Sequence, residues 1–249
     1  MLEGVNIPEA QLIAEYLTIE KRQAMINSWL DGQDEYGRVH GYVDPIGAVT
    51  GRMTHSSPNV AQVTAKGKPY GAAMRACWTV RPGYKLVGMD ADGLELRMLA
   101  HYMKDPEYTK AVCEGKKDDH TDIHSVNQRA AGLDTRDQAK TFIYAFIYGA
   151  GPAKIGSIVG GDAKVGQQLI DKFLTNVPKI SIFRKRVDIA AKRGYLIGID
   201  GRRLIVRNAH AAMNLLIQGG GAVVCKQWLV QIRDRVAATG LDAKLVASI

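Results

Sequence analysis

The sequence has little of three features that would each point to a particular class of protein. It has three cysteines, an odd number at widely spaced positions, which fits a reducing compartment better than a disulfide-rich secreted domain. No apolar run reaches the roughly 18 residues that a membrane span needs, and the first residues lack the basic-then-apolar layout of a secretory signal. We therefore expect a cytoplasmic protein.

What the chain does have is apolar residues and positive charge. It has 249 residues, 46% of them hydrophobic, which is enough for one large or two modest domains with a packed core. Its net charge of +8 favours a polyanionic partner such as nucleic acid, because a basic surface gains affinity by releasing counterions. A merely basic protein has the same composition, so charge alone leaves both readings open.

The apolar periodicity predicts helices over most of the chain. The first, over residues 10–30, is amphipathic, with Leu12, Tyr16 and Trp29 near one side. A capping box of Thr135 and Gln138 opens another, and Asn208 can cap the last. The further predicted helices cover residues 94–104, 121–131, 135–149, 162–176, 179–193 and 208–239, the last interrupted by glycines at 219–221.

Strands are expected between these helices. Residues 195–199 and 202–206 flank Asp200 and Gly201, a strong two-residue hairpin signal. Residues 84–90 and 244–249 are predicted as single strands. Strands from distant parts of the chain with a helical insert between them indicate an α+β fold.

An acidic pattern follows the first of these single strands, in residues 87–97 (VGMDADGLELR). Asp90 ends the strand, and Glu95 lies about one helical turn into the next element. Carboxylates at the end of a strand commonly hold Mg²⁺, because hard oxygens match a hard cation. The alternative is a helix-capping aspartate followed by a surface glutamate.

Two cations and two aromatics share one face of the helix predicted for residues 135–149. Arg136, Lys140, Tyr144 and Tyr148 lie four residues apart, and residues at this spacing share a helix face. The cations stand near the helix N-terminus, where the helix dipole favours anions. This order suits a triphosphate followed by a base. The alternative is a helix with a basic start and an aromatic core stripe.

Histidines and amides supply further candidates. His120 and His124 have Cys113 upstream, but a fourth zinc ligand is missing, so His124 fits better as a third phosphate donor. Amide and arginine side chains can read minor-groove acceptors, which are nearly the same for every base pair. The candidates of that kind are Arg52, Asn59, Gln62, Asn214 and Gln218.

Taken together, these residues resemble family A DNA polymerases, in particular the replicative polymerases of short-tailed bacteriophages. Residues 40–52, the two patterns above and residues 208–218 occur in the order of that family. The resemblance implies a right-hand fragment: an antiparallel palm sheet that carries metal and a helical fingers subdomain that carries the nucleotide. It implies palm in residues 1–104, fingers in 105–194 and a second part of the palm in 195–249, and the host cytoplasm as location if the gene is phage-encoded.

The resemblance also implies roles for single residues. Asp90 and the carbonyl of Ala91 would hold two Mg²⁺ ions, and Glu95 would exclude ribonucleotides by crowding the sugar 2′ position. Lys140 would also donate a proton to the leaving pyrophosphate. The implied ligands of the dNTP are Glu95, His124, Arg136, Lys140, Tyr144 and Tyr148. The implied contacts to primer-template DNA are Arg52, Asn59, Gln62, Asn214 and Gln218.

The chain departs from the family pattern in two places. Position 92 is Asp where the family usually has an uncharged residue. The sequence also stops where a His-Asp-Glu turn with a second metal carboxylate would follow residues 244–249. We therefore expect a separate polypeptide to supply that turn for nucleotidyl transfer. The alternatives are a non-catalytic remnant that binds primer-template or dNTP, and another phosphoryl-transfer enzyme that uses Asp92 as second carboxylate.

Overall fold

The computed structural model describes residues 7–248, which form two compact units. Unit 1 takes the described parts of Met1–Gly47, Met53–Asp90 and Ala247–Ile249, and unit 2 takes Ala48–Arg52 and Ala91–Val246. Contacts alone define these units. The division into palm and fingers at residues 104 and 194 therefore stays a prediction.

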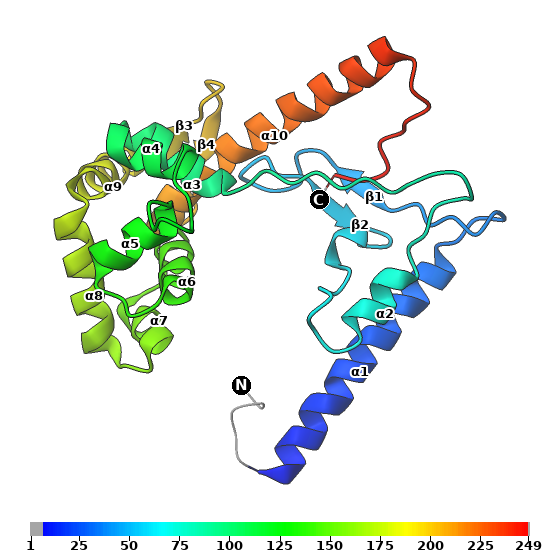
Figure 1. The fold of residues 1–249 in the computed structure, drawn as a ribbon, viewed down its shortest axis with the longest axis horizontal. Helices are drawn as coiled ribbons and strands as arrows, with labels where there is room; N and C mark the ends of the chain where they lie inside the picture. The colour runs from blue at the N-terminus through cyan, green and yellow to red at the C-terminus, as the bar shows by residue number, and fades with distance from the viewer. Residues whose placement is uncertain (1–6, 249) are drawn as a thin grey trace. The chain divides into compact units, whose positions relative to one another are not determined.

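Unit 1 is built on one long helix and a short hairpin (Figure 1). Its elements are α1 (Pro8–Asp31), β1 (Tyr42–Asp44), β2 (Thr54–Ser56), the 3₁₀ turn η2 (Val60–Gln62) and α2 (Gly71–Ala76). The strands are antiparallel, with Val43 opposite His55. Trp29 near the end of α1 meets Trp78 edge to face, with ring centroids 5.1 Å apart.

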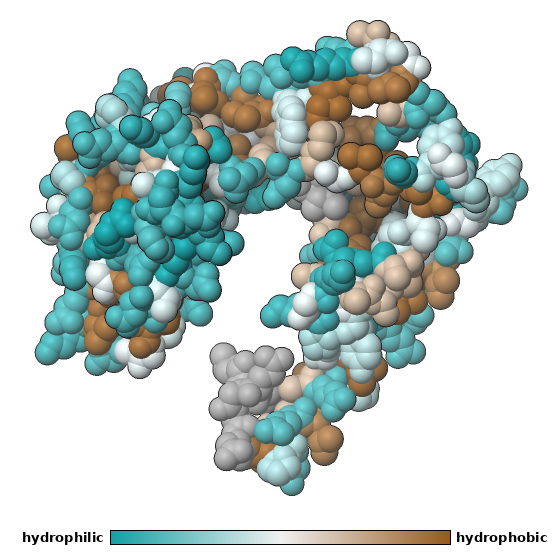
Figure 2. All heavy atoms as spheres, in the orientation of Figure 1, coloured by the Kyte–Doolittle hydropathy of each residue, from teal (hydrophilic) through white to brown (hydrophobic). Residues whose placement is uncertain are grey.

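The helix expected at residues 10–30 is present, but its apolar side is largely exposed. Ala10 and Trp29 are the buried residues of α1. Leu12 is 67% exposed and Tyr16 is 64% exposed, and Figure 2 shows hydrophobic atoms among hydrophilic ones at the surface over this helix. The amphipathic pattern therefore identified the helix correctly but not a buried face, because burial needs a partner surface and side chains such as Leu12 and Tyr16 have little cover within residues 7–248.

Unit 2 is a helical body with one hairpin. Its elements are α3 (Leu94–Met103), α4 (Pro106–Cys113), α5 (Ile123–Ala131), α6 (Arg136–Ile147), α7 (Pro152–Gly156), the 3₁₀ turn η3 (Ser157–Val159), α8 (Ala163–Asn176), α9 (Pro178–Ala191), β3 (Tyr195–Ile197), β4 (Arg203–Ile205), the 3₁₀ turn η4 (Ala209–Ala211) and α10 (Ala212–Thr239). Helices α5 to α8 gather around a common core (Figure 1). In it Phe142 and Phe146 each meet Phe173 edge to face, at centroid distances of 5.1 and 5.4 Å.

Local sequence signals placed most of these helices correctly. The capping box at α6 is present, because the Thr135 hydroxyl accepts from the backbone of Gln138 while the Gln138 side chain accepts from the backbone of Thr135. The predicted hairpin is present, but its turn is longer than the two residues expected: β3 and β4 pair antiparallel with Ile197 opposite Arg203, and Gly201 in the connection has a positive φ of +81°. Together with the small antiparallel hairpins, the helices give the expected α+β class.

The last helix differs from expectation at both its start and its middle. Asn208 accepts from the backbone of His210 and so caps the short turn η4, after which α10 begins at Ala212. The glycines at 219–221 do not interrupt α10. They are buried, and a Cβ on Gly220 would lie 2.9 Å from the sulfur of Met98. Here glycine allows α3 to approach α10 closely, and this packing outweighs its low helix propensity.

Two predicted strands are absent. Residues 84–90 and 244–248 run without regular structure, whereas Ile249 lies outside the described residues. Val87 is 74% exposed and Val246 is 73% exposed. A strand exists through hydrogen bonds to a neighbour, and neither segment pairs with another strand of residues 7–248. The expected palm sheet is therefore represented only by two separate hairpins.

Candidate functional site

The predicted nucleotide face of α6 is a partly exposed side of this helix. Arg136, Lys140 and Tyr144 lie along it, and Tyr148 caps its C-terminal end. Tyr148 is 45% exposed, and its ring centroid lies 6.4 Å from that of Tyr144. The core contacts of α6 come from other residues: Ala139, Phe142, Ile143, Phe146 and Ile147. The alternative of an aromatic core stripe therefore applies in part to Tyr144, which is half-buried against this core, but not to the exposed Tyr148.

Arg136 is held by a carboxylate that the sequence analysis did not single out. Its Nε and Nη2 donate to Oδ1 of Asp122 at 3.1 and 2.9 Å, and Nε also approaches Oδ2 at 3.3 Å. The Asp122 side chain is only 10% exposed and that of Arg136 is 30% exposed. The sequence shows that Asp122 can be the N-cap of α5. It does not show the pairing with Arg136, fourteen positions later, because that pairing depends on how α5 and α6 pack.

Asp122 is also the N-cap of α5. It accepts hydrogen bonds from the backbone of His124 at 3.0 Å and from the Ser125 hydroxyl at 2.6 Å. Burial alone would raise the pKa of Asp122, but hydrogen bonds from Arg136, Ser125 and His124 outweigh it and lower this pKa to about 2. The carboxylate is therefore ionised at neutral pH.

His124 lies beside the same face, with its ring centroid 6.3 Å from that of Tyr144. Burial and then the positive charge of Arg136 lower the pKa of His124, so the imidazole is neutral at pH 7. Its Nδ1 is buried without a hydrogen-bond partner among the described residues. A neutral imidazole still has one N–H to donate.

Glu95 and Gln218 meet Tyr148 from two other helices. The Tyr148 hydroxyl lies 3.5 Å from Oε1 of Glu95 on α3, at the limit of a hydrogen bond. Burial and then the charge of Glu95 raise the pKa of Tyr148, while Gln218 on α10 and Arg52 act in the opposite direction. Three residues from two other sequence patterns, Glu95, Gln218 and Arg52, thus act on the phenol of Tyr148.

Asp90 is exposed at the boundary of unit 1, and Ala91 begins unit 2. No group of three His, Cys, Asp or Glu side chains that could hold a metal ion occurs in residues 7–248. Burial lowers the pKa of His124 and raises that of Tyr144, and the charge of the neighbouring Asp92 makes a smaller, upward contribution to the pKa of each. Asp92 therefore belongs to the electrostatic environment of the α6 face.

The remaining predicted DNA contacts are divided between the units. Arg52, Asn214 and Gln218 belong to unit 2, whereas Asn59 and Gln62 belong to unit 1. The Asn59 side chain accepts from the backbone of Ala61 and so caps η2, a local role that the sequence analysis did not assign.

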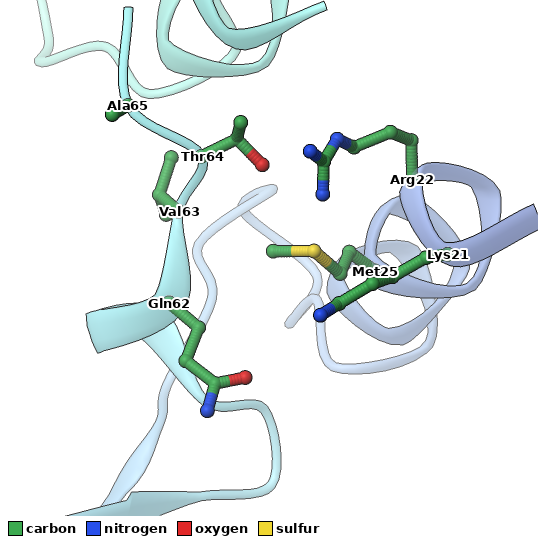
Figure 3. Close-up of a pocket in the computed structure, with 7 residues that line it drawn as sticks. All are labelled: Lys21, Arg22, Met25, Gln62, Val63, Thr64 and Ala65. Carbon is green, nitrogen blue, oxygen red and sulfur yellow. The ribbon is translucent and has the colours of Figure 1, made fainter. Parts of the chain in front are cut away.

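Gln62 lines an open cavity of about 310 Å³ within unit 1. Figure 3 shows α1 side chains facing the segment after η2 across this space. The lining residues are Lys21, Arg22, Met25, Gln62, Val63, Thr64 and Ala65. Lys21 and Arg22 make the cavity basic.

Comparison with known proteins identifies the family. The family model for DNA polymerase family A matches residues 1–249. The chain belongs to DNA polymerase family A. The DNA-directed DNA polymerases of Enterobacteria phage T3 and Escherichia phage T7 are each 41% identical to it over 97% of its length. The more distant thermostable DNA polymerase I of Thermus aquaticus is 27% identical over 82% of the chain.

A solved structure of the family has the same fold. The POL domain of Pol1 from M. smegmatis, in complex with DNA primer-template and dNTP, superimposes with a TM-score of 0.85 at 20% identity, covering 99% of this chain and 46% of that one. The chain spans 38% of the length of each of the two phage polymerases. No helix of residues 7–248 is both long and apolar enough to cross a membrane.

Proposed function

We propose that this chain is the palm and fingers part of a template-directed DNA polymerase, which transfers a nucleotide from dNTP to a primer 3′ end. The observation that carries the proposal is the exposed face of α6, where two cations precede two aromatics in a chain that belongs to family A. The phage relatives are named DNA-directed DNA polymerases, which agrees with this activity.

In the proposed complex the triphosphate lies at the N-terminal end of α6. Arg136 and Lys140 bind its oxygens through charge-assisted hydrogen bonds, and neutral His124 donates one more. Tyr144 stacks beside the incoming base and sugar, and Tyr148 packs below the templating pair. Glu95, next to the Tyr148 hydroxyl, crowds the sugar 2′ position and so selects deoxyribonucleotides.

The DNA contacts that we propose are polar and independent of sequence. Arg52, Asn214 and Gln218 of unit 2 donate to minor-groove acceptors at the primer end. Asn59 and Gln62 of unit 1 extend these contacts. The net charge of +8 supports a phosphate-rich partner.

We also propose that Asp90 and the Ala91 carbonyl contribute to a site for Mg²⁺. Oxygen donors are the ligands that this ion prefers, and Asp90 is exposed and accessible. The donor set fits in kind but is incomplete within residues 7–248, where no cluster of three acidic or other metal-binding side chains occurs. When bound, two such ions would activate the primer hydroxyl and neutralise charge on the phosphates.

The chain's own residues account for binding and for one proton transfer. The primer 3′ hydroxyl loses its proton to solvent and its oxygen bonds to the α-phosphorus, while the bond from that phosphorus to the bridging oxygen of pyrophosphate breaks. Lys140 gives a proton to the leaving pyrophosphate and is returned to its charged form by solvent. Positioning and charge neutralisation do most of the work in such a reaction.

The direct test is calorimetric titration of residues 1–249 with a dNTP. Lys140→Ala should weaken binding by roughly 10- to 150-fold, because each charge-assisted contact contributes about 1.5–3 kcal/mol. Lys185→Ala, an exposed lysine on α9, is the matched control and should bind like the unchanged chain. Equal affinity in the Lys140 variant would remove the nucleotide assignment.

A second candidate is a non-catalytic chain that binds primer-template or dNTP. It is favoured by the single carboxylate candidate, Asp90, where two-metal chemistry needs two. A primer-extension assay with Mg²⁺ and all four dNTPs should give little product from residues 1–249 alone. Robust extension that Asp92→Asn abolishes would instead assign Asp92 as the second ligand.

A further inference from the structure

Asp122 is not itself a proposed ligand of the dNTP, but it contacts two residues that are, Arg136 and His124. Its carboxylate accepts from Nε and Nη2 of Arg136 on α6 and from the backbone N–H of His124 on α5. The residue is 7% exposed, which is unusual for an aspartate.

We infer that Asp122 is a positioning residue for triphosphate recognition, which holds Arg136 and His124 in place through one buried carboxylate. The inference rests on the proposed binding of a dNTP at α6. It adds a residue that would not itself touch the nucleotide.

The geometry at Arg136 carries the first half of this inference. A guanidinium has five N–H donors in a rigid plane. Asp122 takes the donor on Nε and one on Nη2, so both hydrogens of Nη1 and the second hydrogen of Nη2 remain for a ligand. A long, flexible side chain is thereby fixed before the ligand arrives, which lowers the entropy that binding would otherwise cost.

The start of α5 carries the second half. The bond from the His124 backbone to Asp122 is 3.0 Å long, and the Ser125 hydroxyl donates to the other carboxylate oxygen at 2.6 Å. These bonds fix the first turn of α5, from which the His124 side chain projects beside Tyr144. A single carboxylate thus ties the phosphate-facing ends of α5 and α6 together.

The competing explanation is that Asp122 only caps α5. The two explanations differ in charge, because a cap needs an acceptor but not a carboxylate. Asparagine caps helices about as well as aspartate, so Asp122→Asn keeps the cap and one acceptor for Arg136 while it removes the ionic, two-point hold.

The test is titration of residues 1–249 with dATP by calorimetry, for the unchanged chain, Asp122→Asn, Arg136→Ala and the double variant. We expect Asp122→Asn to raise the Kd roughly tenfold, a typical effect for one charge-assisted contact. In the Arg136→Ala background the same substitution should cause no further weakening, because the guanidinium is gone, asparagine keeps the cap that holds the His124 backbone, and an unpaired negative charge is removed.

The matched control is Asp105→Asn at the N-cap of α4, where the carboxylate accepts from the backbone of Glu107 and Tyr108. It should leave the Kd for dATP unchanged. Circular dichroism of every variant checks that the helices persist.

Each outcome decides a different question. Equal weakening by Asp122→Asn in both backgrounds, or no weakening in the unchanged background, would overturn the positioning role and leave the proposed function standing. Failure of the unchanged chain to bind dATP would overturn the proposed function, and the inference with it.

Discussion

Helices α1 and α6 had equally clear helical patterns in the sequence, but the structure treats them differently. In α6 five residues are buried, and Phe142 is 0% exposed. In α1, which is twice as long, two residues are buried and Leu12 is 67% exposed. Local sequence thus decides whether a helix forms, whereas burial depends on which surfaces the rest of the chain supplies.

This difference matters for function because the proposed nucleotide ligands stand on the packed helix. The edge-to-face contacts of Phe142 and Phe146 with Phe173 anchor α6 on α8, and its first residue is tied to α5 through Asp122. A ligand site on a rigid element holds its side chains more precisely than one on a loop.

The largest expected effect comes from removing a core ring of α6. Phe142→Ala should lower the free energy of unfolding by about 3–5 kcal/mol, because it removes a fully buried ring and leaves a cavity. Tyr16→Ala on α1, where the ring is 64% exposed, should change it by less than about 1 kcal/mol. Urea unfolding followed by circular dichroism measures both, and comparable losses would show that α1 is packed as firmly as α6.

A second difference is expected in acid. The pKa of Asp122 is about 2 in the fold and about 3.9 in an unfolded chain, so its ionised form stabilises the fold by roughly 2 kcal/mol. This contribution is present above about pH 4 and is lost as the pH falls towards 2. Between about pH 4 and pH 2, the free energy of unfolding of Asp122→Asn should therefore fall by about 2 kcal/mol less than that of the unchanged chain.

Asp34 of unit 1 provides the comparison. Hydrogen bonds, first from the Arg38 backbone and then from the His40 side chain, lower its pKa, but its side chain is 30% exposed, against 10% for that of Asp122. Asp34→Asn should therefore change the acid limb much less than Asp122→Asn. If both variants changed the pH dependence of stability equally, the pair of Asp122 and Arg136 would not be the more important one.

Gly220 of α10 should accept a side chain only if side chains of α3 move. Gly220→Ala places a Cβ 2.9 Å from the Met98 sulfur and 3.1 Å from the Tyr102 hydroxyl, which should cost about 1–2 kcal/mol of stability despite the better helix propensity of alanine. Gln227→Ala, exposed on the same helix, is the control and should be neutral. Thermal unfolding measures both; a stabilised Gly220 variant would mean that α3 and α10 are not closely packed.

The smallest effect is expected in the segment before Asp90. Leu86→Ala should change stability by less than about 0.5 kcal/mol, because this side chain is 60% exposed and its segment forms no strand. Amide hydrogen exchange of residues 84–90 should be much faster than that of α6. Strong protection there would restore the strand that the sequence predicted.

Several features of the fold could be predicted from the sequence, because they depend on interactions between residues close together in the chain. The capping box of Thr135 and Gln138, the spacing of the four residues on α6 and the Asp200-Gly201 turn each depend on neighbours within a few positions. The order of the motifs also gave the family, which the family model confirms over residues 1–249.

What the sequence could not decide depends on contacts between distant residues. The strands at 84–90 and 244–248 required a hydrogen-bonded neighbour, and the glycines of α10 looked like an interruption until the approach of Met98 was known. The sequence by itself determined most helices of this protein, its α+β class and the alignment of Arg136, Lys140 and Tyr144 along one side of α6, since periodicity and capping act locally. Only the tertiary structure decided which apolar faces are buried and that Asp122 holds Arg136, because both depend on surfaces that meet only once the chain has folded.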